Sequence, residues 1–156
     1  MILPFQLVTI HAEVGKDKFV QPILYILLVN KKKKMYVKVL KVIKNDICNG
    51  EFQPKIWCLD FEYGFLDAVR IVFGVGVILL CCYFHLCQSI RRHAVTKLGL
   101  KKDLKEDPNL ALQLRMFMGL ALVPIEHLQT AFEALTNPYF LDARLKPLAR
   151  YFRVSY

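Results

Sequence analysis

Strand-like and helix-like patterns alternate along the first hundred residues of the chain, and only helical patterns follow. The strand candidates are short apolar runs that end at charged or glycine-containing turns. The predicted order is strand, strand, helix, strand, helix, strand, helix. Such alternation is typical of an α/β sheet in which the later strands run parallel. We therefore expect an α/β domain over residues 1–100 and an all-helical segment over residues 101–156.

Hydrophobic spacing and turn residues place the individual elements. The first two predicted strands, residues 5–12 and 22–29, are joined by a short charged link and indicate a hairpin. The later strands are predicted at residues 55–59 and 75–82, and the helices at residues 35–45, 62–73, 84–98, 109–122, 125–136 and 141–152. Gly99 is placed to end one helix, and the charged residues 101–108 predict a turn.

The charge balance is strongly basic. The chain of 156 residues carries 22 Lys and Arg against 13 Asp and Glu, a formal net charge of +9. A positive field of this size favours polyanions, either nucleic acid or an anionic membrane face. The alternative is that the lysines keep a chain that is 55% hydrophobic in solution. Charge alone leaves both explanations open.

Cysteine usage and the N-terminus bear on the cellular compartment. The chain has five cysteines, an odd number that cannot all pair within the chain, and three of them lie in one apolar segment. This pattern indicates reduced, intracellular thiols rather than a disulfide framework. The first five residues lack the basic region of a signal peptide, and no small-residue cleavage site follows an apolar core. We therefore expect an intracellular protein.

An apolar run over residues 71–86 needs a test for membrane insertion. The run is shorter than the roughly 20 residues of a membrane-spanning helix. It contains Gly74, Gly76 and His85 and is rich in β-branched and aromatic residues. These features predict the end of a helix followed by a buried strand. A membrane span over residues 71–86 remains the alternative.

Asp60 follows the predicted strand 55–59, and strand ends are where α/β sheets place their sites. Two-metal phosphoryl transfer needs carboxylates that converge on divalent cations from separate strands. Asp60 fits one such ligand. Asp is also a common helix N-cap, so a capping role is the alternative. Glu62 suits the positive first turn of the helix that follows.

Two further groups of candidate residues lie at the two ends of the predicted helix 84–98. Cys82 and His85 have the Cys-x-x-His spacing of half a metal site, although a buried thiol and a histidine bonded to the backbone explain them equally. The basic residues of this helix and its exit are candidates for phosphate contacts. They are Arg91, Arg92, Lys97, Lys101 and Lys102. A solvated helix C-terminus, where cations are favoured, is the alternative.

Several segments together resemble the Mutator-like element (MULE) transposase domain. Residues 59–62, Leu-Asp-Phe-Glu, resemble the family's Asp-Phe-Glu after a strand, and residues 82–88 resemble its Cys-Phe-Phe-His-Leu-Cys-Gln-like motif. Residues 5–12 are similar to its Gln-Leu-Tyr-Thr-Ile-His strand. Residues 120–124 and 131–135 are similar to its Ala-Phe-Val-Pro and Ala-Phe-Glu-Leu helices. The resemblance extends over nearly the whole chain.

The resemblance implies an α/β fold, a ribonuclease-H-like mixed sheet interrupted by a helical insertion. It also implies a nuclear enzyme that cuts and joins DNA with an Asp, Asp, Glu triad and Mg²⁺ or Mn²⁺. Asp60 matches the second Asp, and Cys82 and His85 match the family's Cys-x-x-His. The family's Asp-Gly-Thr-Phe segment, with the first Asp, and its Asn-Asn-x-x-Glu segment, with the Glu, are both absent from this sequence. The first strand is therefore expected to be missing or partial.

These departures shape the functional expectation. We expect a fragment or derivative of a MULE-type transposase that holds one catalytic carboxylate, binds no divalent ion stably and cuts no DNA alone. DNA is the expected partner, with no small-molecule substrate and no membrane. Two alternatives stay open: a non-catalytic module that binds nucleic acid or protein, and a small membrane protein that spans the bilayer at residues 71–86.

Overall fold

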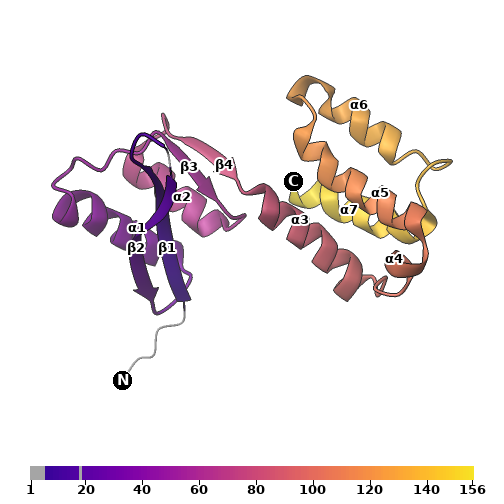
Figure 1. The fold of residues 1–156 in the computed structure, drawn as a ribbon, viewed down its shortest axis with the longest axis horizontal. Helices are drawn as coiled ribbons and strands as arrows, with labels where there is room; N and C mark the ends of the chain where they lie inside the picture. The colour runs from indigo at the N-terminus through magenta and orange to yellow at the C-terminus, as the bar shows by residue number, and fades with distance from the viewer. Residues whose placement is uncertain (1–5, 18) are drawn as a thin grey trace. The chain divides into compact units, whose positions relative to one another are not determined.

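The computed structural model describes residues 6–17 and 19–156, and the chain divides into two compact units. The units are Met1–Leu80 and Cys81–Tyr156 (Figure 1). The first is a mixed α/β unit, and the second is helical. Phe5, where the first strand was expected to begin, and the other N-terminal residues tested for a signal peptide lie outside the described residues.

The boundary between the units differs from the one expected after residue 100. Helix α3 (Tyr83–Arg92) was grouped with the strands in the sequence analysis, but it belongs to the second unit. Leu86 and Ile90 are buried on this helix, and α3 packs against helix α5 (Pro108–Gly119). The apolar face of α3 is therefore buried among the helices that follow it.

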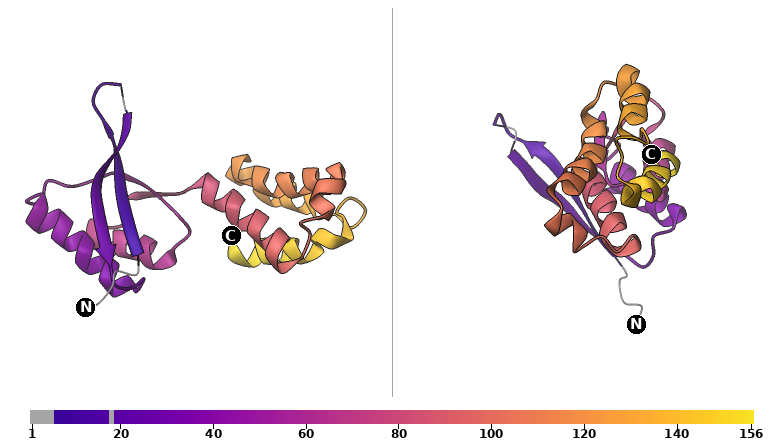
Figure 2. Two further views of the ribbon diagram at one scale, coloured as in Figure 1. Left: turned by 60° about the horizontal axis from the view of Figure 1, so that its bottom comes forward. Right: turned by 90° about the vertical axis from the view of Figure 1, so that its right-hand side faces the viewer.

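The first sheet is the predicted hairpin. Strands β1 (Gln6–Val14) and β2 (Phe19–Leu28) pair antiparallel along their whole length. The register shifts between Ile10 and His11, where His11 lies opposite Pro22. Proline has no backbone N–H to donate, so it is found in sheets at bulges and edges. Figure 2 shows the hairpin as a long twisted ribbon beside the helices of its unit.

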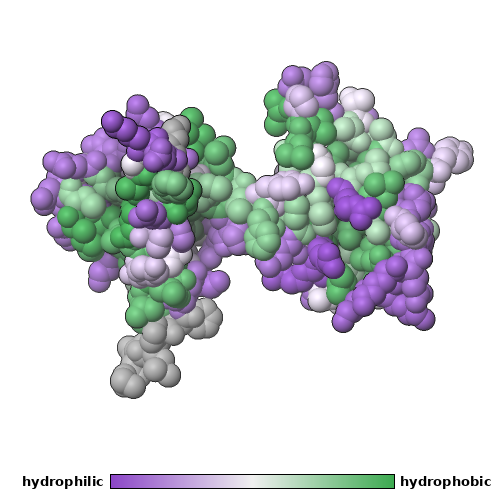
Figure 3. All heavy atoms as spheres, viewed as in Figure 1, coloured by the Kyte–Doolittle hydropathy of each residue, from purple (hydrophilic) through white to green (hydrophobic). Residues whose placement is uncertain are grey.

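The two faces of the hairpin differ in burial, although the outer face of β2 is as apolar as its inner face. On β2, Leu28 is 2% exposed and points to the core, whereas the neighbouring Leu27 is 66% exposed. Tyr25 is equally exposed on the outer face. Hydrophobic atoms on the hairpin surface are visible in Figure 3. The first unit therefore exposes large apolar side chains on the outer face of β2.

The second sheet joins β3 (Ile56–Leu59) to β4 (Ile78–Cys81), with α2 (Tyr63–Phe73) as their connection. The Ile78 N–H donates to the Lys55 carbonyl at 2.9 Å. This bond places the beginnings of the two strands side by side, as in a parallel pair. Among the described residues the four strands form two separate two-stranded sheets. The single mixed sheet expected from the sequence is therefore not continuous, because no described strand links β1 to β3.

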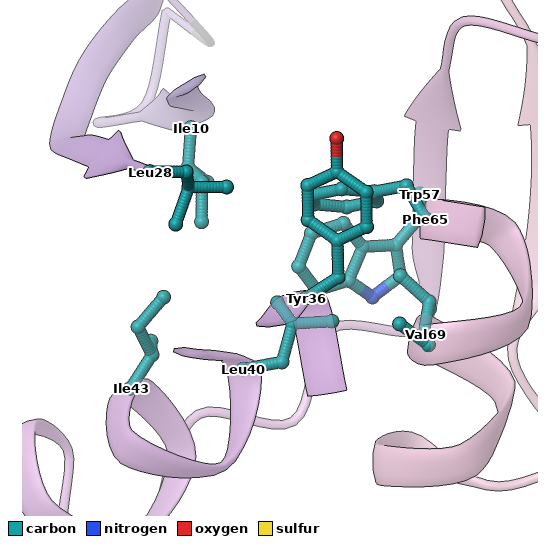
Figure 4. Packing of buried hydrophobic residues seen from close by; sticks show 9 residues of the cluster. Ile10, Leu28, Tyr36, Leu40, Ile43, Trp57, Phe65 and Val69 are labelled. Atoms are coloured by element: carbon teal, nitrogen blue, oxygen red, sulfur yellow. The ribbon is translucent and has the colours of Figure 1, made fainter. Parts of the chain in front are cut away.

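One hydrophobic core serves both sheets of the first unit. Helix α1 (Lys33–Val42), extended by a π-helical turn (Ile43–Ile47), packs against α2. Each sheet places apolar residues in the cluster formed by these helices (Figure 4). The buried members are Ile10, Leu28, Tyr36, Leu40, Ile43, Trp57, Phe65, Ala68 and Val69.

The second unit consists of helices joined by short turns. After α3 come a π-helical turn (His93–Lys97), α4 (Asp103–Glu106), α5, a 3₁₀ turn (Leu120–Leu122), α6 (Ile125–Leu135), a 3₁₀ turn (Ala143–Leu145) and α7 (Lys146–Ser155). The charged turn expected at residues 101–108 contains the short helix α4. Asp107 then caps α5, because its Oδ1 accepts hydrogen bonds from the Asn109 and Leu110 amides.

The apolar run 71–86 is divided among three elements. It comprises the end of α2, a turn with β4, and the beginning of α3. Within residues 6–17 and 19–156, no helix has both the length and the hydrophobicity to cross a membrane. The proposed span over residues 71–86 is therefore corrected to a helix end, a strand and a helix start.

Candidate functional site

Asp60 lies where the sequence places it, directly after β3. Its side chain is exposed, and its Oδ1 accepts a hydrogen bond from the Glu62 amide at 3.3 Å. The N-cap of α2 is Glu62 rather than Asp60, and no side chain caps this helix. The capping role considered for Asp60 is therefore wrong. Its carboxylate instead closes a short turn between the strand and the helix.

Glu62, Tyr36 and Gln6 form a polar cluster beside Asp60. The Tyr36 hydroxyl lies 2.5 Å from Glu62 Oε1 and 2.8 Å from Gln6 Oε1, so it donates its one proton to either acceptor. Lys31 Nζ lies 3.8 Å from the second Glu62 oxygen. Burial, followed by the hydrogen bond and negative charge of Glu62, raises the pKa of Tyr36 well above its usual value. The tyrosine is therefore a permanent hydrogen-bond donor at neutral pH.

The carboxylates at this strand end do not fit the two-metal site that the resemblance implies. Glu62 is engaged by Tyr36 and Lys31, which leaves Asp60 as the carboxylate with no cation partner among the described residues. In the same part of the chain, no three His, Cys, Asp or Glu side chains gather closely enough to hold a metal ion. A pair of divalent ions needs several converging carboxylates.

Cys82 and His85 belong to the second unit, whereas Asp60 belongs to the first. Cys82 is the N-cap residue of α3 and makes no side-chain capping bond, and His85 is exposed in the first turn. The His85 ring lies edge-on to Phe84, with their centroids 5.6 Å apart. No disulfide joins the cysteines of the described chain. The local geometry of this pair shows neither a metal site nor a buried histidine.

The basic residues predicted as phosphate contacts are all exposed. Arg91 and Arg92 end α3, Lys97 ends the π-helical turn, and Lys101 and Lys102 follow. Lys102 lies 3.9 Å from Glu106, and none of the other four forms an ion pair within the described residues. The structure therefore presents an uncompensated positive surface on this helix and its exit.

Helix α7 contacts the end of α3, and the sequence analysis did not include its cations among the phosphate contacts. Tyr151 on α7 lies 3.1 Å from Ser89 Oγ, and its ring stacks on His93 with centroids 3.9 Å apart. Burial raises the pKa of Tyr151, but the hydrogen bond with Ser89 and the charge of Arg92 contribute to a net lowering. Arg92 therefore lies near α7, which adds its own exposed cation Arg150.

We use the term basic face for five exposed cations of α3, its exit and α7 that form no ion pair in the described chain. They are Arg91, Arg92, Lys97, Lys101 and Arg150. His93 lies between α3 and α7, where burial and the nearby Lys97 charge lower its pKa. At neutral pH this histidine is uncharged, and its ring serves packing rather than charge.

Comparison with protein-family models, with curated proteins and with solved structures finds no match to this chain. The functional argument therefore depends on the strand end at Asp60 and on the basic face.

Sequence reasoning missed the polar cluster around Glu62 for a simple reason. Tyr36 and Gln6 are distant in sequence from Glu62, and neither belongs to a recognisable motif. The alternating burial of β1 places Gln6 on the core side, and Tyr36 was assigned to a helix. The available signal was Tyr36 itself, which lies in a predicted helix. A buried Tyr normally has a hydrogen-bond partner, so its hydroxyl indicates a polar contact.

Proposed function

We propose that this chain is a derivative of a MULE-type transposase domain that binds DNA in the nucleus and does not cut it alone. The observation that carries the proposal is the basic face, whose exposed cations have no acidic partners among the described residues. Cations of this kind release counterions from a nucleic-acid backbone when they bind it. The resemblance supplies the family, and the basic face supplies the contact surface.

The arrangement of the first unit supports a ribonuclease-H-like ancestry. The pairs β1–β2 and β3–β4 lie over a shared helical layer, and Asp60 follows β3. A mixed sheet that lacks its first strand would leave two such pairs. The proposal accounts in this way for both the divided sheet and the acidic residue at the strand end.

The absence of cutting follows from the carboxylates at that strand end. A two-metal mechanism stabilises both the attacking and the leaving oxygen, and one carboxylate cannot hold both ions. Asp60 alone fits the family's pattern here, and Glu62 is already bound by Tyr36 and Lys31. We therefore propose retention of binding without strand transfer.

DNA binding is tested by the salt dependence of affinity for a duplex oligonucleotide. Each phosphate contact contributes roughly 0.9 to the slope of log affinity against log salt concentration. The double variant Arg91→Ala/Arg92→Ala is expected to lower the slope by about 2. The matched control Lys16→Ala/Arg70→Ala removes two exposed cations of the first unit and is expected to keep the slope. An affinity that does not change with salt would rule out the proposal.

The lack of cutting is tested separately with supercoiled plasmid in Mg²⁺ or Mn²⁺. We expect no nicked product from the wild-type chain. Nicking by the wild type that disappears in the Asp60→Asn variant would show an active site and overturn this part of the proposal. Nicking that persists in Asp60→Asn would indicate a contaminating nuclease, so the assay would be repeated after further purification.

A further inference from the structure

Helix α1 and the residues next to it carry a second group of cations, in the first unit. Residues 31–44 contain seven lysines and no acidic residue. Three of these lysines are engaged within the unit. Lys31 and Lys33 form ion pairs with acidic side chains, and Lys44 donates to a backbone carbonyl of α2 at 3.1 Å. The remaining lysines form no ion pair within the described residues.

Three of the remaining lysines lie on one face of α1. Lys34, Lys38 and Lys41 are spaced by four and three residues, which places them one above another along the helix. All three are exposed, and Tyr36 and Leu40 on the opposite face are buried in the core (Figure 4). We call Lys34, Lys38 and Lys41 the lysine row.

The stability of the helix does not explain the lysine row. Lys34 lies in the first turn of α1, where the helix dipole is positive and favours acidic residues, yet this turn contains none. Lys34 and Lys38 are four residues apart, a spacing at which like charges repel each other. Only Lys41, in the last turn, suits the dipole. An anion from outside the chain would relieve the repulsion along this face.

We propose that the lysine row is a second DNA-binding surface, which contacts the phosphate backbone through the first unit. The inference rests on the proposed DNA binding and adds a site to it. The row is about 10 Å long, and a DNA strand presents one phosphate about every 3.4 Å along the helix axis, so three lysines can contact one strand. Lysine binds phosphate as a point charge and reads no base, so this contact does not depend on DNA sequence.

An anionic membrane is the less suitable partner for the lysine row. A helix that binds at a membrane surface inserts its apolar face among the lipids. The apolar face of α1 is already occupied, because Tyr36, Leu40 and Ile43 belong to the core of the first unit. Charge without a free apolar face favours the DNA backbone over the bilayer.

The test measures the affinity of the full chain for a duplex oligonucleotide at several salt concentrations. The variant Lys34→Ala/Lys38→Ala/Lys41→Ala is expected to lower the slope of log affinity against log salt by about 2.7, because each phosphate contact contributes roughly 0.9. Alanine is the best helix former, so α1 is expected to stay folded. The matched control Lys16→Ala/Lys55→Ala/Arg70→Ala removes three exposed cations of the same unit outside α1 and is expected to keep the slope.

The outcomes separate this inference from the proposed function. An unchanged slope in the lysine-row variant, with a lower slope in Arg91→Ala/Arg92→Ala, overturns the inference alone. A lower slope in the lysine-row variant alone supports the inference and contradicts the role of the basic face. Equal losses in the lysine-row variant and its control indicate an effect of net charge and overturn the inference, as does a wild-type affinity that is independent of salt. Binding to phosphatidylserine vesicles that requires the lysine row, with unchanged DNA affinity, also overturns it.

Discussion

At the scale of single residues, Tyr36 connects three parts of the first unit. It is 1% exposed and joins helix α1 to the start of β1 and the N-cap of α2 through one hydroxyl. A hydrogen bond to a charged acceptor such as Glu62 is stronger than one between neutral groups. The hydroxyl is therefore a stabilising contact between the hairpin and the helices.

We predict that Tyr36→Phe lowers the free energy of unfolding by about 1–3 kcal/mol, because a half-buried carboxylate loses its donor. The control is Tyr25→Phe, which removes a hydroxyl from a side chain that is 66% exposed. The control is expected to change stability by less than about 0.5 kcal/mol. Urea unfolding of both variants measures the difference, and equal effects would contradict the role assigned to Tyr36.

Arg144 has the corresponding role in the second unit. Its guanidinium lies 2.6 Å from both Asp107 and Asp142 and 3.3 Å from Asp103. Hydrogen bonding to Arg144 lowers the pKa of Asp142 to about 2. The Leu110 amide, and then Arg144, lower the pKa of Asp107. The cluster ties α4 and the α5 cap to the turn before α7.

Because of this cluster, we expect the folded state to become less stable as the pH falls. A carboxyl whose pKa is lowered by folding stabilises the folded state above its unfolded pKa of about 3.9. The stabilisation is lost as the pH falls from about 4 towards about 2. Arg144→Gln should therefore lower the Tm at pH 7, with a smaller effect at pH 2.5. Arg150→Gln, which removes an exposed cation, is the control, and a pH-independent effect of Arg144→Gln would argue against the ion pairs.

The sequence correctly placed Asp60 directly after a strand, but it did not predict the polar cluster beside it. Asp60 was found because it follows a short apolar strand, a local pattern. The partners of Tyr36 are 26 and 30 residues away in the chain, and two of the three carboxylates bound by Arg144 are 37 and 41 residues away. Local spacing carries no information on such pairs, so only coordinates reveal them.

At the scale of elements, β2 shows what hydrophobicity alone cannot decide. The strand is apolar at nearly every position, so its sequence does not say which residues face the core. The structure places Leu28 inside and Leu27 outside. Leu7 of β1 pairs with Leu27 on the outer face, where both leucines are exposed.

The adjacent pair of leucines provides a test of this register. Leu28→Ala is expected to cost about 2–4 kcal/mol of unfolding free energy, because it leaves a cavity in the core. Leu27→Ala is expected to cost less than about 0.5 kcal/mol. Chemical denaturation measures both. A one-residue slip of the hairpin would reverse the order of the two variants.

Most helices and strands were predictable, because turn residues and periodic spacing mark their ends. The strand predicted at residues 75–82 is shorter in the structure, where β4 begins at Ile78. Gly76 and the turn before Ile78 explain the difference, since glycine weakens a strand. Helix α4 was missed because its four residues are mostly charged and too few to show a period.

At the scale of the whole molecule, sequence order suggested one continuous sheet and a boundary after residue 100. The continuity of the sheet and the position of the boundary both depend on contacts between distant parts of the chain, which local sequence patterns do not show. The pairing of two strands depends on the segments that lie between them in space. The unit to which α3 belongs depends on the apolar surface that contacts its buried face. Ile90 on α3 is completely buried, and local spacing in the sequence does not show that the later helices bury it.

Because each unit has a core of its own, we predict that the two units lose stability separately. Leu40 lies in the core of the first unit and is 1% exposed, and Leu110 lies in that of the second and is fully buried. Leu40→Ala and Leu110→Ala should each lower the opening free energy of the unit that contains it by about 2–5 kcal/mol. Hydrogen exchange measured by mass spectrometry reports this for each peptide of the chain.

The double variant Leu40→Ala/Leu110→Ala tests whether the two units unfold independently. Substitutions in independent units should add within about 0.5 kcal/mol, whereas a shared cooperative transition spreads each loss over the whole chain. Leu40→Ala alone should therefore leave the exchange of α5 and α7 unchanged. Faster exchange throughout both units in either single variant would contradict this prediction, because it would show that the two units unfold in one cooperative transition.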